Sequence, residues 1–418
     1  MKQTRRQVVL GLLALGLTGC SRGGVPSNAA LETARAAETP ALPTVPNAGW
    51  DAWVAGFRPR AVSSGIAERT FDTAFSFAGF IPGVIERDRN QTETTRTLED
   101  YLAIAASTDR IGLGQQNLAG YGSLLTEVEA RYGVEAHVLA SVWGLESRYG
   151  TRRGNIPVIS ATSTLAYEGS RASFFQGQLL AALRILQNGD IAPSRMTGSW
   201  AGAIGHTQFI PTSYEAYAVD FRGDGRRDIW ADDPTDALAS TGAYLARSGW
   251  TRGQPWGIEV RLPPGFNTAL AGRSATRSTS EWASLGVRDM RGRALPDYGS
   301  AAILLPDGST GPAFMIFRNF AVIARYNNSE KYVIGVGHLS DRLLGRPSIQ
   351  GDFAPDANGL TQADRRRIQE RLTAAGFNTQ GTDGVIGPNT EAAIRAYEAA
   401  NRLPITGTAT RSLLQRLG

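Results

Sequence analysis

The chain has 418 residues, of which 42% are hydrophobic and 19% charged, and this balance predicts folded domains with sizeable cores. The formal net charge of +5 favours an anionic partner. Nucleic acid is not the expected partner, because the sequence has no dense Lys/Arg cluster and no interleaving of basic and aromatic residues.

The first twenty residues have the pattern of an export signal. Lys2, Arg5 and Arg6 precede an apolar run over residues 8–17. This run is shorter than the roughly twenty residues that a membrane-spanning helix needs. Its basic flank fits a cleaved targeting segment, so we exclude residues 1–20 from the folded domains.

Cys20 is the only cysteine in the chain, so an intramolecular disulfide is excluded. It follows Gly19 at the end of the apolar run, and the segment resembles a bacterial lipoprotein signal, in which the cysteine is acylated and becomes the first mature residue. Acyl chains would anchor the protein durably to a membrane. Residues 4–6 also partly match a twin-arginine export signal. An incidental thiol in a signal segment is the alternative.

Two breaks divide the remaining chain. Residues 21–48 are rich in Ala, Pro, Ser and Thr and predict a flexible tether. Residues 346–359 combine turn-forming residues with no sustained apolar period and predict a linker. These breaks separate a large domain over residues 49–345 from a small one over residues 360–418.

The large domain is expected to be mainly α-helical with a small β insertion, an α+β class. Apolar spacing of three and four residues predicts helices over residues 98–106, 118–132, 134–149 and 329–344. Short apolar runs separated by Pro and Gly clusters predict strands over residues 258–262, 301–305 and 314–317.

The small domain is expected to be a three-helix module. Thr361 is placed to cap a helix that stops at Gly376, and Pro388 occupies a first-turn position of the second helix. Thr408 is the predicted cap of the third helix.

Several enzyme classes find no support in the sequence. His137, His206 and His338 lie far apart, and no pair has helical metal-ligand spacing, so a zinc enzyme is not expected. The chain also has no Gly-x-Ser-x-Gly elbow and no Walker-type phosphate loop.

Glu146 is the first candidate for chemistry. It projects from an apolar helical stripe, four residues after Val142 and seven after Leu139. Burial among apolar and aromatic groups raises a carboxyl pKa, and a general acid near neutral pH needs this property. The alternative is a core ion pair with Arg148 or Arg152.

Residues 199–214 form a second candidate segment. Their small residues allow the backbone to approach a ligand closely. Gln208 can both donate and accept hydrogen bonds, which suits the hydroxyl and acetamido groups of a sugar. A structural Gly/Ala-rich turn is the alternative.

Four motifs in order carry a family resemblance. They are residues 142–150 around Glu146, 202–211, 217–225, and 325–329 followed by Tyr332. Together they resemble the membrane-bound lytic murein transglycosylase B family over residues 49–345. The resemblance implies a lysozyme-like helical fold, with Glu146 as the catalytic residue at a helix end. It also implies sugar-binding roles for Ser199, Gln208, Tyr326 and Tyr332.

The reaction implied by this resemblance is cleavage of the β-1,4 bond between N-acetylmuramic acid and N-acetylglucosamine, with formation of 1,6-anhydromuramic acid ends. Glu146 would act in turn as acid and base, because a hydroxyl of the same sugar replaces water as the attacking group. Two alternatives stay open. One is a hydrolytic muramidase, which needs a second carboxylate, and the other is a noncatalytic wall-binding lipoprotein.

The family also has an EF-hand-like loop at residues 220–232. Asp220, Asp224 and Asp228 occupy positions one, five and nine of such a loop. Arg222 at position three and Ala231 at position twelve stand where oxygen ligands are expected. No cofactor is expected to be required, and a solvated loop held by the same turn is favoured over bound calcium.

The small domain resembles the peptidoglycan-binding module of wall-degrading enzymes, with Gln369, Asp383, Thr390 and Tyr397 among the matching residues. The expected partners are peptidoglycan glycan strands and, through lipidated Cys20, a membrane. Ser21 after that cysteine is not an acidic retention signal, which places the anchor on the periplasmic side of the outer membrane. We expect a monomer.

Overall fold

The computed structural model describes residues 42–90 and 97–418. The predicted export signal, Cys20 and most of the predicted tether lie outside these residues. Within the described ranges, no helix combines the length and apolar character needed to cross a bilayer.

Residues 42–48, at the end of the predicted tether, already contact the large domain. The Val45 N–H donates to the Phe80 carbonyl at 2.9 Å, and Leu42 packs against the cluster of buried side chains that includes Phe80. Helix α2 then begins at Ala48, where the Asn47 side chain accepts a hydrogen bond from the Trp50 N–H at 3.0 Å. The last residues of the predicted tether are therefore attached to the folded domain.

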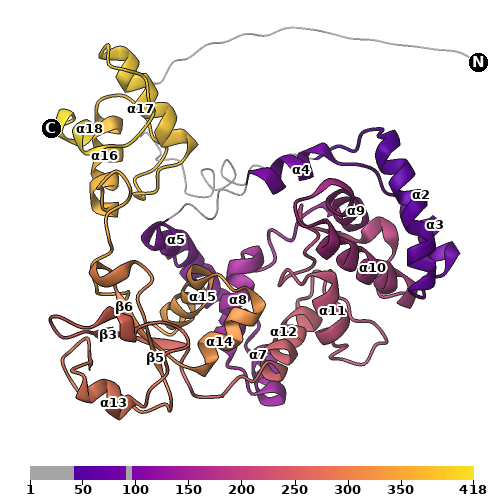
Figure 1. Cartoon of the computed structure of the whole chain (residues 1–418), viewed down its shortest axis with the longest axis horizontal. Helices are drawn as coiled ribbons and strands as arrows, with labels where there is room; N and C mark the ends of the chain where they lie inside the picture. Colours follow the sequence, from indigo (N-terminus) through magenta and orange to yellow (C-terminus); the bar gives the residue numbers. More distant parts are fainter. Residues whose placement is uncertain (1–41, 91–96) are drawn as a thin grey trace, which may run out of the picture. The chain divides into compact units, whose positions relative to one another are not determined.

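Helices dominate the chain up to residue 247 (Figure 1). Their bounds are α2 (Ala48–Ser63), α3 (Glu68–Phe75), α4 (Pro82–Arg89), α5 (Leu98–Ala105), α6 (Thr108–Gly120), α7 (Gly122–Tyr132), α8 (Ala136–Ser147), α9 (Val158–Glu168), α10 (Ala172–Asn188), η2 (Pro193–Arg195), α11 (Pro211–Tyr217) and α12 (Thr235–Arg247). Two short strands, β1 (Ile156–Pro157) and β2 (Thr197–Gly198), pair antiparallel. The main core gathers buried side chains of these helices, including Leu139, Trp143, Leu183 and Leu238.

One predicted helix is divided into two. Tyr121 interrupts the segment 118–132, because its N–H bonds back to Asn117 and closes α6, while its carbonyl accepts from Leu125 and starts α7. The apolar spacing continues across Tyr121, so periodicity alone could not reveal the break.

A four-stranded antiparallel sheet follows, in the order β4, β3, β6, β5. The strands are β3 (Gly257–Arg261), β4 (Arg288–Asp289), β5 (Ala302–Leu304) and β6 (Ala313–Ile316), and the helices between them are η3 (Thr268–Leu270), α13 (Thr279–Ser284) and η4 (Gly308–Thr310). Met315 packs with Trp282 on one face, whereas Phe314 and Ile316 pack with Trp256 on the other. Because both faces of β5 and β6 are buried, these two strands appear in the sequence as short apolar runs, whereas β3 alternates apolar and polar residues.

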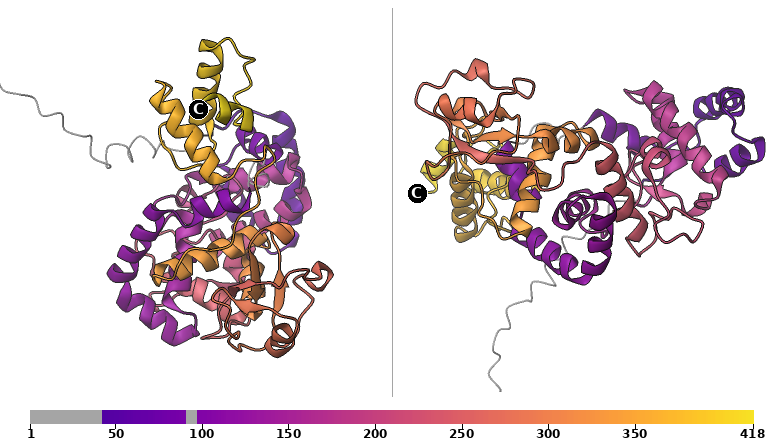
Figure 2. Two further views of the ribbon diagram at one scale, coloured as in Figure 1. Left: turned by 90° about the vertical axis from the view of Figure 1, so that its left-hand side faces the viewer. Right: turned by 90° about the horizontal axis from the view of Figure 1, so that it is seen from below.

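Helices α14 (Arg318–Tyr326) and α15 (Glu330–Leu343) return the chain to the helical core, and α15 packs along α8 (Figures 1 and 2). The chain is thus mainly α-helical with a small sheet, as predicted from the sequence.

The C-terminal module consists of α16 (Gln362–Ala374), α17 (Pro388–Ala400) and α18 (Arg411–Arg416), coloured gold in Figures 1 and 2. Thr361 caps α16 in a capping box with Asp364, and Pro388 opens α17, as predicted. The third cap was predicted wrongly: Thr410, rather than Thr408, accepts the hydrogen bond from the Leu413 N–H at 3.1 Å. Both threonines precede the same apolar residues, which explains the two-residue error.

Candidate active site

Glu146 lies in the last turn of α8, immediately before a sharp reversal of the chain. Arg148, Tyr149 and Gly150 all have positive φ angles, of 50°, 56° and 83°. The Tyr149 N–H bonds back to the Trp143 carbonyl at 3.2 Å and closes the helix. The carbonyl end of a helix disfavours a carboxylate, so Glu146 occupies a position where a merely structural acid has little advantage.

A cleft of about 1100 Å³ opens at Glu146. Its walls come from segments far apart in the sequence: Tyr101 from α5, Leu145 from α8, Trp200 from the segment predicted to approach a ligand, and Tyr332 from α15. The cleft therefore combines aromatic and aliphatic walls with many polar and charged side chains.

The cleft has an excess of cationic side chains. Arg87, Arg110, Arg171 and Lys331 line it in the described part of the chain, against the carboxylates of Glu146 and Glu330 alone. Burial lowers the pKa of Arg110, whose guanidinium also donates to the Ile104 carbonyl at 2.8 Å. The charge of these walls complements an anionic ligand.

Tyr332 contacts the Glu146 carboxylate directly. Its hydroxyl donates to Glu146 Oε1 at 2.5 Å, and its side chain is only 6% exposed. Burial, followed by the nearby charge of Glu146, raises the pKa of the Tyr332 hydroxyl well above its usual value. The hydroxyl therefore stays protonated and remains a donor to the carboxylate.

The ring of Tyr326 packs against the ring of Tyr332. The two rings are stacked, with centroids 6.5 Å apart and planes 6° from parallel. The Tyr326 hydroxyl donates to the Thr207 carbonyl, and burial raises its pKa well above the usual value. Tyr326 also packs against Phe209 and Tyr244. Its contacts therefore connect α14 to the segment that contains Gln208.

Ser199 and Gln208 make contacts that shape this segment. The Ser199 hydroxyl accepts from the Ala203 N–H at 3.1 Å. Gln208 has a positive φ of 52°, and its amide nitrogen donates to the carbonyls of Arg153 and Gly205 at 3.0 and 2.9 Å. Of the four predicted sugar-binding residues, Tyr332 alone is among the described residues that line the cleft.

His206 is buried and forms several hydrogen bonds, although the sequence predicted no individual role for it. It accepts a hydrogen bond at Nδ1 from the Trp143 indole (3.1 Å), so the ring proton lies on Nε2, which donates to the Ala231 carbonyl (2.7 Å). The Ser147 hydroxyl donates to the His206 carbonyl at 2.5 Å. Burial lowers the pKa of His206, so the ring is neutral. These hydrogen bonds attach Ser147, the residue that follows Glu146, to the segment around His206, and attach that segment to Ala231.

Gly150 permits this close packing. A Cβ atom at this position would lie 2.3 Å from His206 Nδ1, and the φ of 83° also disfavours any other residue. The motif around Glu146 contains this glycine, but only the fold reveals which side chain approaches it.

The EF-hand-like loop has the turn of such a loop without its full ligand set. Asp220 accepts N–H groups from Gly223, Asp224 and Gly225 at 2.7 to 3.1 Å. Arg222, at the third position, forms an ion pair with Glu127 at 2.5 Å. Within the described ranges, no cluster of three or more His, Cys, Asp or Glu side chains could hold a metal ion. Arg222 thus places a cation where the third oxygen ligand of an EF-hand belongs.

Hydrogen bonds to a side chain outside the ligand positions join the two ends of this loop. Asp236 accepts from the N–H groups of Phe221 and Asp228, at 2.9 and 2.8 Å, and so joins the two ends of the loop. Asp190 holds Arg227 through two further contacts, at 3.1 and 2.5 Å. These contacts hold the two ends of the loop together and attach it to Asp190.

Comparisons with known proteins match two parts of the chain. A family model described as Transglycosylase SLT domain matches residues 49–341, and a model of a peptidoglycan binding domain matches residues 361–417. The Membrane-bound lytic murein transglycosylase B of Escherichia coli (strain K12) is 33% identical over 226 residues. The match covers 52% of the chain and 60% of that relative, so the chain spans less than two thirds of the relative's length.

Solved structures also resemble the chain. SltB3 from Pseudomonas aeruginosa, in complex with NAG-anhNAM-pentapeptide, has 46% identity and a TM-score of 0.71, over 89% of this chain and 100% of that chain. The Escherichia coli lytic transglycosylase Slt35, in complex with calcium, has 27% identity and a TM-score of 0.60, over 72% of this chain and 94% of that chain.

Proposed function

The chain belongs to the family of transglycosylase SLT domains, and from this premise we propose that it is a peptidoglycan lytic transglycosylase. It would cleave the β-1,4 bond between N-acetylmuramic acid and N-acetylglucosamine and leave 1,6-anhydromuramic acid ends. The observation that carries the proposal is the Glu146 carboxylate, held by Tyr332 at the cleft wall. The ligand names NAG-anhNAM-pentapeptide and NAG-NAM-pentapeptide of the two SltB3 complexes support the same chemistry.

In the first step, protonated Glu146 donates its proton to the glycosidic oxygen as the bond from that oxygen to C1 of the muramic acid breaks. In the second step, the Glu146 carboxylate takes the proton of the C6 hydroxyl while O6 attacks C1. The bond from C1 to the glycosidic oxygen is thus replaced by a bond from C1 to O6 of the same sugar, and no water is consumed. The attacking hydroxyl belongs to the same molecule, which gives it a large advantage over water.

Tyr332 would orient this single carboxyl group. Its hydroxyl binds Oε1, so it fixes the plane in which Glu146 receives and releases a proton. We propose this role in place of direct sugar binding. Ser199 Oγ, the Gln208 amide nitrogen and the Tyr326 hydroxyl also contact the backbone of the chain. We therefore propose that these three residues shape this segment in addition to the sugar-binding roles that the resemblance implies.

The cationic side chains of the cleft would bind the anionic parts of the polymer. Arg87, Arg171 and Lys331 line the cleft. Peptidoglycan carries carboxylates on its peptides, and an arginine binds a carboxylate through paired hydrogen bonds.

A hydrolytic muramidase is the second candidate. It would need a second carboxylate, about 5 to 9.5 Å from the first, to act as nucleophile or base. Glu330 is the other carboxylate that lines the cleft within the described ranges. A noncatalytic wall-binding role is the third candidate, because the C-terminal module matches a peptidoglycan binding domain and would hold the wall without catalysis.

Digestion of purified cell wall, followed by mass spectrometry, distinguishes the three. We expect products that lack added water and end in 1,6-anhydromuramic acid, and we expect none from a Glu146→Gln variant. Products with added water would favour the muramidase, and a Glu330→Gln variant would then lose activity. An inactive wild-type protein that still sediments with the wall would favour the binding role.

For the location, we propose a lipid anchor at Cys20 on the periplasmic side of the outer membrane. The sequence of residues 1–20 supports it, as does the name of the membrane-bound Escherichia coli relative. Metabolic labelling with a fatty-acid analogue should mark the wild-type protein and leave a Cys20→Ala variant unlabelled. Labelling of both would refute the anchor. We also propose that the protein is a monomer and needs no metal.

A further inference from the structure

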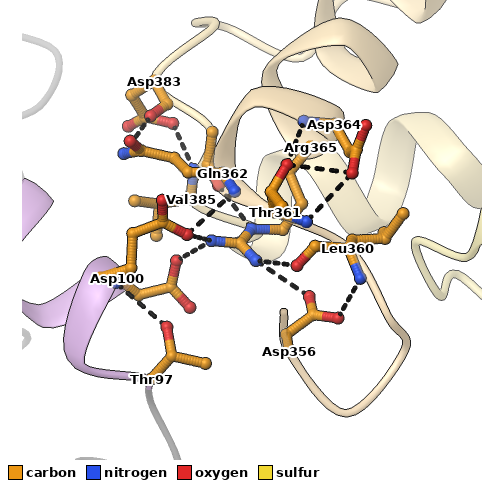
Figure 3. A network of polar contacts seen from close by, with 12 residues as sticks. Thr97, Asp100, Asp356, Leu360, Thr361, Gln362, Asp364, Arg365, Asp383 and Val385 are labelled. Carbon is orange, nitrogen blue, oxygen red and sulfur yellow. Dashed lines mark hydrogen bonds and ion pairs between the residues drawn. The ribbon is translucent and has the colours of Figure 1, made fainter. Parts of the chain in front are cut away.

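Arg365 is a buried cation at the start of the C-terminal module. It lies on α16, and its side chain is only 2% exposed. Within the module, its guanidinium donates to the carbonyls of Gly384 and Leu360 at 2.8 and 3.1 Å. It also binds the Asp356 carboxylate at 3.0 Å (Figure 3).

The remaining contacts of Arg365 reach a different domain. Its Nη2 atom binds the Glu99 carboxylate at 3.3 Å. The same atom also binds the Asp100 carboxylate (Figure 3). Glu99 accepts a second hydrogen bond, from the Gln362 N–H of the module at 2.9 Å. Both acids lie in the first turn of α5, where Thr97 caps the helix. One side of this contact is therefore cationic and the other anionic.

Helix α5 also forms part of the cleft wall. Tyr101, Ile104 and Ala105 of this helix line the cleft that contains Glu146. The helix that receives Arg365 in its first turn thus contributes, within two further turns, to the wall of the candidate active site.

A second attachment holds the segment before the module. Glu259, on β3, accepts hydrogen bonds from the N–H groups of Gln350 and Gly351 at 2.6 to 3.1 Å. Ile349 and Phe353 pack against the core cluster that contains Val142 and Trp256. The segment predicted as a linker is therefore bound along part of its length.

We propose that Arg365 is a positioning residue, which docks the C-terminal module on α5 and so fixes its place relative to the cleft. The inference rests on the proposed function for its substrate, a peptidoglycan strand long enough to contact both the module and the cleft. A strand bound to a docked module would meet the cleft at a defined distance, whereas a flexible tether would spread the same strand over many positions.

The contact between the module and α5 depends on charged side chains, so the loss of any one of them should weaken it. Arg365, Glu99, Asp100 and Asp356 are at most 16% exposed, so each depends on the others for its solvation. If one partner is removed, the remaining groups stay buried and incompletely paired. Undocking then becomes favourable, because water can solvate the groups that have lost a partner.

The first test measures docking itself, on the full chain. The variants are Arg365→Met, the double variant Glu99→Gln with Asp100→Asn, and the matched control Arg366→Met, whose exposed side chain is the next on α16. By calorimetry and small-angle scattering, we expect one unfolding transition for the wild type and for Arg366→Met. The other two should show a separate transition for the module and a larger radius of gyration.

The double variant keeps the test valid if Arg365→Met impairs folding of the module, because its changes lie on α5. A single transition and an unchanged radius of gyration in the double variant would overturn the docking role.

The second test measures the consequence for catalysis. We expect the double variant to degrade insoluble cell wall about tenfold more slowly than the wild type, and to cleave a short soluble wall fragment within about twofold of the wild-type rate. Equal rates on both substrates, or equal losses on both, would overturn the proposal. If the wild type forms no anhydro products, the proposed reaction fails, while the calorimetric test of docking stands.

Discussion

At the scale of single residues, the contact between Tyr332 and Glu146 joins side chains 186 positions apart. The family resemblance placed both residues in the site but assigned Tyr332 to the sugar. Sequence spacing holds no information about a contact between two helices that pack side by side in the fold. The same holds for His206, whose ring links Trp143 to Ala231 through contacts that no motif reveals.

Replacing Tyr332 by Phe should lower kcat by about ten- to a hundredfold, because a hydrogen bond to a charged group contributes about 1.5 to 3 kcal/mol. KM should change little. The alkaline limb of the pH-rate profile should move to higher pH, because the hydroxyl favours the ionised carboxylate. Steady-state kinetics on a soluble wall fragment would measure both effects. A Tyr298→Phe variant, at a partly exposed ring, is the control, and a Tyr332→Phe profile identical to the wild type would refute the orienting role.

His338 should make stability depend on pH. Burial lowers its pKa from 6.5 to about 4. Between these values the unfolded chain binds a proton that the folded chain does not, so the free energy of unfolding falls as pH decreases from 6.5 to 4. The loss is on the order of 3 kcal/mol. Thermal melts should show a shallower pH dependence for His338→Gln in this window, and parallel curves would contradict the assignment.

At the scale of elements, the helices and strands that the sequence predicted individually lie close to observed ones, whereas helices such as α9 and α10 and the strand β4 were not predicted individually. The helix 134–149 appears as α8 and the helix 329–344 as α15, each shorter by one or two residues at its ends. The two errors, at Tyr121 and at Thr408, have a common cause. Apolar spacing shows which face of a segment is buried, whereas hydrogen bonds of the backbone decide where a helix ends.

The loop at residues 220–232 is predicted to fold without calcium, although the Escherichia coli Slt35 structure contains that ion. Because Arg222 binds Glu127 and Asp236 joins the loop ends, the melting temperature should be unchanged by EDTA or by added calcium. A double variant, Arg222→Asp with Ala231→Glu, should gain a rise in melting temperature with calcium. A fall of the wild-type melting temperature in EDTA, restored by calcium, would contradict this prediction.

At the scale of the whole molecule, charge should govern adsorption to the wall. The chain carries a formal net charge of +5, and cations predominate in the described cleft. Salt shortens the range of such attraction, from about 10 Å at 0.1 M to about 3 Å at 1 M. Sedimentation of Glu146→Gln protein with purified wall should therefore decrease severalfold over this range. Glycan strands stripped of peptides should bind with weaker salt dependence, and equal salt dependence of both would argue against peptide carboxylates as the target.

The charged dock between Arg365 and α5 limits how freely the two domains could be exchanged in an engineered chimera. A module grafted onto another wall-degrading domain would bring a cation into a surface that lacks Glu99 and Asp100. The reverse exchange would leave both acids facing a foreign module. Functional grafts should therefore require that the first turn of α5 and the first turn of α16 be transferred together, as a matched pair.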